Sequence, residues 1–349
     1  MKTRTLSAIA AFALASTALA GSAYARDQIR VVGSSTVYPF TTAVAEQFGK
    51  AGTFKTPVVE STGTGGGFKL FCEGVGEATA DVSNASRAIT KGEFETCSKN
   101  GVTDIVELKI GFDGIVIAES KEGTPLKLTR TQVFMALAKD VPGPDGKLMA
   151  NPNKMWSDID PSLPAIKIEV LGPPPTSGTR DAFLELFMDQ GARKIESLAA
   201  LRKEDSKAYD VVWKSVREDG AYIDAGENDN LIVQKLEANP DAVGIFGYSF
   251  LEENASTIQG AEIEGVVPAF EAIADGSYDG ARPLFVYFKK QHIGVVPGLE
   301  EFLAEYASAK AMGEDGYLTA KGLVPLPADE LAKQQEAAKA LETIAAPTS

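Results

Sequence analysis

The sequence predicts an α/β fold with mostly parallel sheets, divided between two domains. Short apolar stretches alternate with longer segments of helical periodicity from about Gln28 onward, which is the pattern of layered strands and helices. The chain has 349 residues, more than one hydrophobic core usually covers, and 44% of them are hydrophobic. Together these observations predict two α/β cores built from one chain.

The first 25 residues are typical of a secretory signal peptide. Lys2 and Arg4 precede an apolar, alanine-rich run from Leu6 to Ala20, and an Ala-Tyr-Ala tripeptide at 23–25 offers a cleavage site. The run is shorter than the roughly 20 apolar residues of a transmembrane helix. We therefore expect residues 1–25 to be a signal peptide, and the rest of the chain to fold in the periplasm without inserting into the membrane.

The predicted strands are short runs rich in Val, Ile, Leu and Phe, bounded by glycine, proline or polar residues. They are Ile29 to Val32, Pro57 to Glu60, Ile105 to Ile110, Gly114 to Ala118, Ile168 to Leu171, Val243 to Phe246 and Leu284 to Phe288. Predicted helices follow several of them, because apolar residues recur at helical spacing, as at Phe40, Val44 and Phe48 or at Phe183 and Phe187.

Two helix starts carry the residues of a capping box, in which a Thr side chain and a Glu or Gln three residues later cap each other's backbone. They are Thr90 with Glu93 and Thr129 with Gln132. At the other end of the chain, residues 328–349 are rich in Ala, Glu and Lys, which predicts a C-terminal helical tail on the surface with a frayed end.

The chain is acidic, with a formal net charge of −14. Nucleic acid and anionic lipid are therefore not expected partners, although a small anion can still bind where local donors outweigh the distant field. The two cysteines are Cys72 and Cys97. An even count in an exported protein predicts a disulfide between them, with two free buried thiols as the alternative.

The residues that most hydrolases and metalloenzymes need are scarce in this sequence. One histidine, His292, follows a predicted strand, and we interpret it as a solvated side chain. A single histidine cannot supply a histidine-rich metal site, and the many acidic residues single out no acid–base pair. We therefore expect no catalytic residues, no metal site and no cofactor.

Three turns rich in Gly, Ser and Thr share one design, because each follows a predicted strand and opens a predicted helix. They contain Ser35, Thr36 and Val37; Thr64 and Gly65; and Ser177, Gly178 and Thr179. Helix N-termini leave backbone N–H groups unpaired and carry partial positive charge, and glycine lets the backbone approach a ligand closely. Each turn alone is typical of an ordinary helix start, but the three together predict an anion site.

Two arginines lie beside these turns. Arg87 follows Ser86 directly, and Arg180 follows Thr179. A guanidinium group offers a planar fork that matches the edge of an oxyanion. A surface salt bridge is the alternative for each arginine, because the chain has 48 acidic residues. With Ser86, Arg87 and Arg180 the predicted ligand set is complete.

Several motifs along the chain are distinctive when taken together. They are Gly-Ser-Ser-Thr-Val-Tyr-Pro at 33–39, Gly-Thr-Gly-Gly-Gly-Phe-Lys at 63–69, Asp-Val-Ser-Asn-Ala-Ser-Arg at 81–87, Ser-Gly-Thr-Arg at 177–180, Asn-Pro-Asp-Ala-Val-Gly-Ile at 239–245 and Arg-Pro-Leu at 282–284. From about residue 30 to residue 325 the sequence resembles the PstS-like phosphate-binding proteins of phosphate ABC transporters. These are class II periplasmic binding proteins with two lobes and a mixed, mostly parallel sheet in each lobe.

The resemblance implies a ligand held between the lobes by Thr36, the Val37 N–H, Thr64 and the 177–179 turn. Two departures stand out. Ser86 occupies the position where many members carry an aspartate, which accepts the proton of hydrogen phosphate and repels sulfate. An arginine that many members place just before the Ser-Gly-Thr turn is also absent, so Arg87 and Arg180 look like its replacements. Asp113 and Glu60 are candidates for the missing proton acceptor, although each is equally interpretable as a structural carboxylate.

The resemblance also implies two hinge crossovers, near Ile110–Ala118 and near Gly244–Phe250. Residues 26–113 and 251–327 would then form the first lobe, and residues 114–250 the second. Hinge rotation would close the lobes around a dehydrated anion, with the glycines near the second crossover absorbing the change.

By the same resemblance, the chain binds inorganic phosphate with high affinity and delivers it to the permease of an ABC importer in the inner membrane. We expect a monomer that contacts neither nucleic acid nor lipid. Because of Ser86, sulfate, tungstate and an organic phosphate stay open as alternative ligands. A secreted phosphohydrolase and an adhesive surface protein are the hypotheses from other classes; the first requires turnover and the second predicts no saturable ligand.

Overall fold

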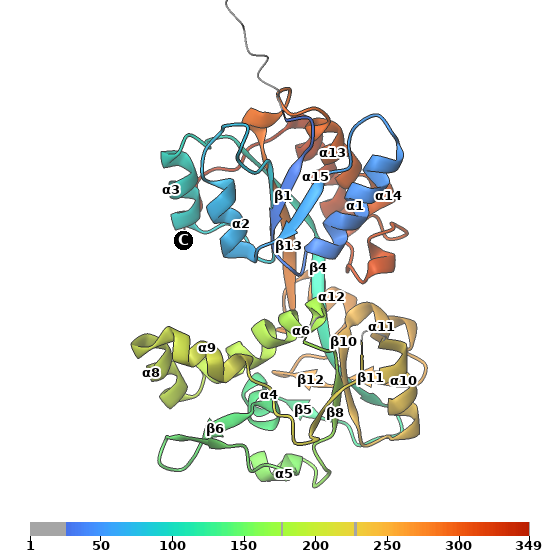
Figure 1. The fold of residues 1–349 in the computed structure, drawn as a ribbon. Coiled ribbons are helices and arrows are strands. Elements are labelled where there is room, and N and C mark those ends of the chain that lie inside the picture. The colour runs from blue at the N-terminus through green and yellow to red at the C-terminus, as the bar shows by residue number, and fades with distance from the viewer. Residues whose placement is uncertain (1–25, 176, 227–228, 349) are drawn as a thin grey trace, which may run out of the picture.

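The computed structural model describes residues 26–175, 177–226 and 229–348, which fold into two lobes, one above the other in Figure 1. The predicted signal peptide, residues 1–25, lies outside the described residues. Two long strands, β4 (Ile105–Ser120) and β13 (Ala281–Lys289), run from one lobe toward the other and join them. The predicted α/β architecture with two lobes is confirmed.

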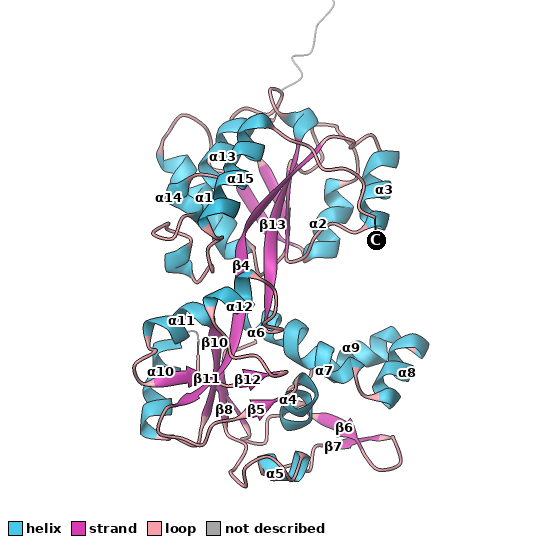
Figure 2. Ribbon diagram, turned by 180° about the vertical axis from the view of Figure 1, so that it is seen from behind, coloured by secondary structure: helices cyan, strands magenta, loops and turns pink. Residues whose placement is uncertain are grey.

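The upper lobe is a sheet in the order β2-β1-β3-β13-β4, flanked by helices on both faces (Figure 2). Strands β1, β2 and β3 pair in parallel, whereas β13 runs antiparallel to both of its neighbours. Besides β4 and β13, the elements of this lobe are β1 (Arg30–Gly33), α1 (Tyr38–Lys50), β2 (Val58–Ser61), α2 (Thr64–Phe71), β3 (Val82–Ala85), α3 (Lys91–Lys99), α13 (Leu299–Tyr306), α14 (Ala309–Met312) and α15 (Ala328–Ala340).

The lower lobe continues the same ladder from β4 through β10 and β8 to β9, with β11 also paired to β4. Its strands are β5 (Lys127–Leu128), β6 (Asp140–Pro142), β7 (Leu148–Ala150), β8 (Val170–Gly172), β9 (Tyr222–Asp224), β10 (Val243–Gly247), β11 (Ile258–Gly260) and β12 (Glu262–Ile263). Its helices are α4 (Arg130–Leu137), α5 (Trp156–Ile159), α6 (Gly178–Phe183), α7 (Gln190–Arg193), α8 (Glu196–Glu204), α9 (Ser206–Lys214), α10 (Asp229–Ala238), α11 (Tyr248–Glu253) and α12 (Phe270–Ala274).

The position of the second crossover differs from the sequence-based expectation. Strand β10 and helix α11, which include Gly244–Phe250, stay in the lower lobe, where β10 pairs with the second half of β4. The chain returns to the upper lobe along β13, so residues 251–280 lie with the lower lobe and not with the first lobe as predicted. The reason is pairing, because β11 completes the sheet at β4 before the return.

Strand β4 joins two stretches that the sequence predicts as separate strands. Gly111 has a φ of +149°, and the β4–β13 register shifts between Leu284 and Phe285. A side chain at Gly111 would meet the Val324 carbonyl oxygen at 2.6 Å, so glycine is required there. The irregularity bends the ladder without ending it, and the hinge therefore consists of two paired strands.

Local predictions in both lobes are confirmed. Cys72 and Cys97 form a disulfide that links the end of α2 to α3. The capping boxes at Thr90 and Thr129 are present, each with both reciprocal hydrogen bonds. The tail is helical over α15, where Lys109 of β4 forms an ion pair 2.8 Å long with Glu330.

The interpretation of His292 as a solvated side chain is wrong. His292 is buried, and its Nδ1 atom lies 2.6 Å from the carboxylate of Asp81, which is also buried. Arg26 pairs with the same carboxylate, so distant segments build a charged network inside the upper lobe.

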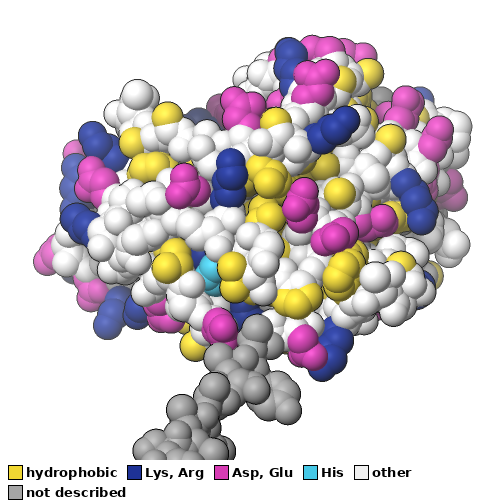
Figure 3. Space-filling model, turned by 90° about the horizontal axis from the view of Figure 1, so that it is seen from above, with side chains coloured by type: hydrophobic (Ala, Val, Ile, Leu, Met, Phe, Trp, Pro, Cys, Tyr) yellow, Lys and Arg dark blue, Asp and Glu magenta, His cyan; other side chains and the backbone are white. Residues whose placement is uncertain are grey.

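Within the described ranges, every helix is too short or too polar to cross a membrane. Seen from above, the upper lobe shows acidic and basic side chains interspersed over its surface (Figure 3).

Candidate functional site

The parallel strands β1, β2 and β3 place the turns that follow them at one edge of the upper sheet. Gly33, at the end of β1, is in register with Ser61 of β2 and Asn84 of β3. Because the carboxyl ends of parallel strands meet at one edge, the predicted turns at 34–37, 62–65 and 86–87 share it. This edge faces the lower lobe (Figure 1).

A cavity of about 270 Å³ lies between the lobes and brings two of the three predicted turns together. Thr36 lines it from the upper lobe, and Ser177, Gly178 and Thr179 line it from the lower lobe. The remaining lining residues are Pro39, Phe40, Asp113, Ile115, Asp229, Gly247, Ser249, Phe250, Lys321 and Gly322. The predicted convergence of turns from separate lobes is therefore observed for the first and third turns.

Helix starts point at this cavity from both sides. Helix α1 begins after Val37, with a proline in its first turn, and the Val37 N–H lies 3.4 Å from Ser34 Oγ. Ser177 is the N-cap of α6, and its Oγ accepts a hydrogen bond of 3.2 Å from the Thr179 N–H. Ser35 lies beside the cavity, where its Oγ donates to Asp181 at 3.2 Å. The turns thus bring hydroxyl groups and helix starts to the cavity, where Asp113, Asp229 and Lys321 add charged side chains.

Lys321 is the cation in the lining of the cavity, and Arg282 lies directly behind the lining residues Thr36 and Asp113. The sequence analysis singled out neither of them as a ligand. The Nη2 atom of Arg282 donates to Thr36 Oγ1 at 3.0 Å, and its Nε atom lies 3.5 Å from Asp113 Oδ2. Both side chains are largely buried, with 13% of Arg282 and 14% of Asp113 exposed. The available signal was the Arg-Pro-Leu motif, although only the β13–β4 register shows that Arg282 faces Asp113.

Asp113 carries features of a ligand-facing acid. It lines the cavity, and its Oδ2 atom is buried without a hydrogen-bond partner among the described residues. Burial raises the pKa of the Asp113 carboxyl; the charge of Arg282 opposes the rise, and Glu185 adds to it. A carboxylate has several lone pairs, so Asp113 can face Arg282 and still accept a hydrogen bond from a protonated ligand.

The second turn is at the shared edge but does not line this cavity. Thr64 Oγ1 and Ser86 Oγ are 3.0 Å apart, and the Ser86 N–H donates to Thr64 Oγ1 at 3.1 Å. Gly65, in the first turn of α2, is exposed. Arg87 makes two hydrogen bonds of 2.8 Å to Glu93, whose carboxylate raises the pKa of Arg87. The salt bridge that was the alternative for Arg87 is therefore present.

Arg180 is buried, but it lines another cavity. Its guanidinium lies 4.5 Å from the ring centre of Tyr222 and donates to the Pro173 carbonyl oxygen at 3.2 Å. Burial raises the pKa of Tyr222 to about 12, so the ring beneath the cation is a neutral phenol. The cavity that Arg180 lines, together with Lys139 and Lys214, contains none of Thr36, Ser177 or Thr179.

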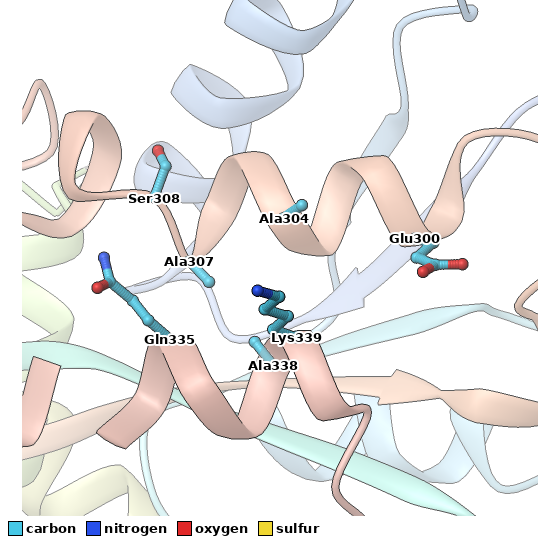
Figure 4. Close-up of a pocket in the computed structure, with 7 residues that line it drawn as sticks. All are labelled: Glu300, Ala304, Ala307, Ser308, Gln335, Ala338 and Lys339. Carbon is cyan, nitrogen blue, oxygen red and sulfur yellow. The ribbon is translucent and has the colours of Figure 1, made fainter. Parts of the chain in front are cut away.

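A further hollow in the upper lobe lies between α13 and α15 (Figure 4). It is lined by Glu300, Ala304, Ala307, Ser308, Gln335, Ala338 and Lys339. The lining combines three alanines with four polar or charged side chains, and it contains none of the predicted ligand residues. Among the described residues no cluster of His, Cys, Asp or Glu has the arrangement of a metal site.

Comparison with known proteins places these features in context. A profile described as the PBP superfamily domain matches residues 18–310. The protein SphX of Synechococcus elongatus is 31% identical over 74% of this chain and 67% of its own length. The phosphate-binding protein PstS of Staphylococcus saprophyticus is 28% identical over 88% of this chain and 83% of its own length.

Among solved structures, a possible phosphate binding protein from Planctomyces limnophilus is similar to this chain with a TM-score of 0.71 and 28% identity. The match covers 90% of this chain and 99% of that one. The shared architecture thus extends over both lobes.

Proposed function

The chain belongs to the PBP superfamily and, within it, to the PstS-like phosphate-binding proteins, and from that membership we propose that it binds inorganic phosphate between its lobes. The observation that carries the proposal is the interlobe cavity, where Thr36 and the 177–179 turn meet the Arg282–Asp113 pair. Removing water from a dianion is costly, so a binding site needs donors already aimed at its oxygens.

Each group has a defined task in this proposal. The hydroxyls of Thr36 and Ser177 and the N–H groups at the starts of α1 and α6 donate to the phosphate oxygens. The guanidinium of Arg282 supplies the compensating charge from the hinge. Phosphate would then be solvated by both lobes at once, which favours the closed arrangement.

Asp113 supports phosphate over the alternative oxyanions. Hydrogen phosphate carries a proton that it can donate to the carboxylate of Asp113, whereas sulfate has no proton at neutral pH and would face a carboxylate. Asp113 thereby takes the role that Ser86 cannot take. Glu60, the other candidate acceptor, pairs with Arg30 at 3.2 Å.

The finer steps of the function follow from family membership. We propose that the protein acts in the periplasm as a monomeric, non-enzymatic binding protein, without a cofactor, and delivers phosphate to an ABC permease in the inner membrane. A relative of this chain is named a phosphate-binding protein, which supports phosphate binding. The described residues include no membrane-spanning helix.

Calorimetric titration with phosphate, arsenate and sulfate at two pH values tests the proposal. We expect micromolar or tighter binding of phosphate and arsenate, with sulfate rejected. Equal binding of phosphate and sulfate would assign the site to oxyanions in general, and no heat with any of the three would exclude the function. Release of product from a phosphate ester under the same conditions would indicate an enzyme instead.

A further inference from the structure

Arg282 already holds a carboxylate partner from the lower lobe. Its Nη1 atom forms an ion pair with Glu185 Oε2, while Nη2 donates to Thr36 and Nε faces Asp113. Every nitrogen of the guanidinium therefore has a neighbour. Two carboxyl groups already surround this one cation, which leaves Arg282 with little uncompensated charge for an entering anion.

The two carboxylates differ in how easily they can leave Arg282. Asp113 is on hinge strand β4, directly opposite Arg282 in the register with β13, and its side chain is only 14% exposed. The side chain of Glu185 is 50% exposed and can turn to solvent at little cost in burial. An incoming anion would therefore displace Glu185 and keep Asp113.

Glu185 belongs to a helical segment that is irregular where it meets Arg282. A π-helical segment, Leu184–Asp189, follows α6 directly and leads into α7. Such segments are rare and are frequent at functional sites, because they change the direction of side chains along a helix. Asp181, four residues before Glu185, accepts a hydrogen bond from Ser35 Oγ. This segment thus offers one carboxylate to the upper lobe and another to the hinge.

We propose that Glu185 is a tethered competitor, which occupies the anion's place on Arg282 in the empty protein and moves to solvent when phosphate binds. This inference rests on the proposed function. Only molecules in which Glu185 has left Arg282 bind the anion. The apparent affinity is therefore the intrinsic affinity multiplied by the fraction of molecules in which Glu185 is disengaged.

The variant Glu185→Gln tests the proposal by calorimetric titration with inorganic phosphate. If Glu185 engages Arg282 in about nine molecules of ten, its removal tightens the apparent affinity about tenfold, and we expect at least about fivefold. Glu237→Gln is the matched control, since Glu237 is an exposed residue of α10 in the same lobe. This control makes the same change in charge and should bind like the wild type within about twofold.

The variant Glu185→Asp tests whether Glu185 acts by occupying Arg282 or only through its negative charge. The aspartate keeps the charge but is one methylene shorter, so it reaches Arg282 less well, and we expect its affinity to lie between those of the wild type and Glu185→Gln. An affinity of Glu185→Gln equal to or weaker than that of the wild type overturns the inference and leaves the proposed function intact. A tighter Glu185→Gln with an unchanged Glu185→Asp also overturns it. If the wild type binds no phosphate, the proposed function fails and the inference falls with it.

Discussion

Two buried arginines, Arg282 and Arg180, lie in contrasting regions of the molecule. Arg282 reaches the interlobe cavity from hinge strand β13 and contacts Thr36 and Asp113. Arg180 is next in sequence to the turn that lines this cavity, yet its guanidinium stacks on Tyr222 and donates to a backbone carbonyl behind the turn. Only the first of them has its charge where an anion between the lobes would meet it.

The contrast shows that adjacency in sequence does not set direction in space. Successive residues of a helix are rotated by about 100°, so a side chain two positions after Gly178 leaves the helix on another face. Arg282 is distant in sequence from every predicted turn, but the pairing of β13 with β4 places it opposite Asp113. In the site that we propose, Arg282 of the hinge therefore provides the positive charge and the turns provide the uncharged donors.

The largest expected effect is the loss of binding in Arg282→Gln. Removing the cation leaves Asp113 buried beside the anion, and truncating one partner of a buried charge pair costs about 2 to 5 kcal/mol. We expect a phosphate affinity weakened by at least about 30-fold in calorimetry. Arg180→Gln, its matched control, should bind within about threefold of the wild type. Loss of phosphate binding in Arg180→Gln, with binding kept in Arg282→Gln, would contradict the roles that we assign to the two arginines.

The next effect concerns selectivity. In Asp113→Asn the acid is replaced by an amide, whose N–H₂ can donate to sulfate and no longer repels it. We expect the preference for phosphate over sulfate to fall by about tenfold or more, because a rejecting charge has become a donor. Competition titrations of the two anions measure this preference directly. An unaltered preference would show that the proton acceptor is elsewhere.

The variant Arg180→Met tests whether Arg180 contributes to the stability of the fold, in contrast to the ligand role of Arg282. The stack on Tyr222 and the hydrogen bond to Pro173 are lost, which costs about 1 to 2 kcal/mol of unfolding free energy. Urea unfolding of ligand-free protein measures the change, and phosphate binding should persist. A variant as stable as the wild type would remove the structural role that we assign to Arg180.

The smallest expected effect is that of Thr64→Val. Thr64 is bonded to Ser86 at the shared strand edge but does not line the cavity of the ligand-free structure. If closure brings it to the anion, as the family resemblance implies, losing one neutral hydrogen bond weakens binding by about 1 kcal/mol, roughly fivefold. An unchanged affinity would limit the site to the turns after β1 and β8.

Features set by neighbouring residues were predictable from the sequence. The capping boxes at Thr90 and Thr129 depend on residues three positions apart, and the single possible disulfide followed from two cysteines in an exported chain. The turns at 35–37 and 177–179 were recognisable because strand, glycine and helix start are contiguous. Their meeting in one cavity required the two-lobed architecture that the family resemblance supplied.

Features set by distant pairing were not predictable. Gly244 suggested a hinge, but in the structure a side chain there would meet Ile232 at 2.7 Å, so the glycine serves helix packing. His292 is preceded by Lys289, Lys290 and Gln291, and this polar run conceals the burial of His292 against Asp81 of a distant segment. Arg282 was seen only as part of a strand motif. In each case the partner is distant in sequence, and only the folded structure shows which residues meet.

A crystal structure of the protein with bound phosphate tests the central claim most directly. The account predicts an anion in the cavity between Thr36 and Ser177, within hydrogen-bond distance of Arg282 and Asp113. Phosphate held by Arg180 beside Tyr222, with Arg282 still bound only to protein carboxylates, would contradict it.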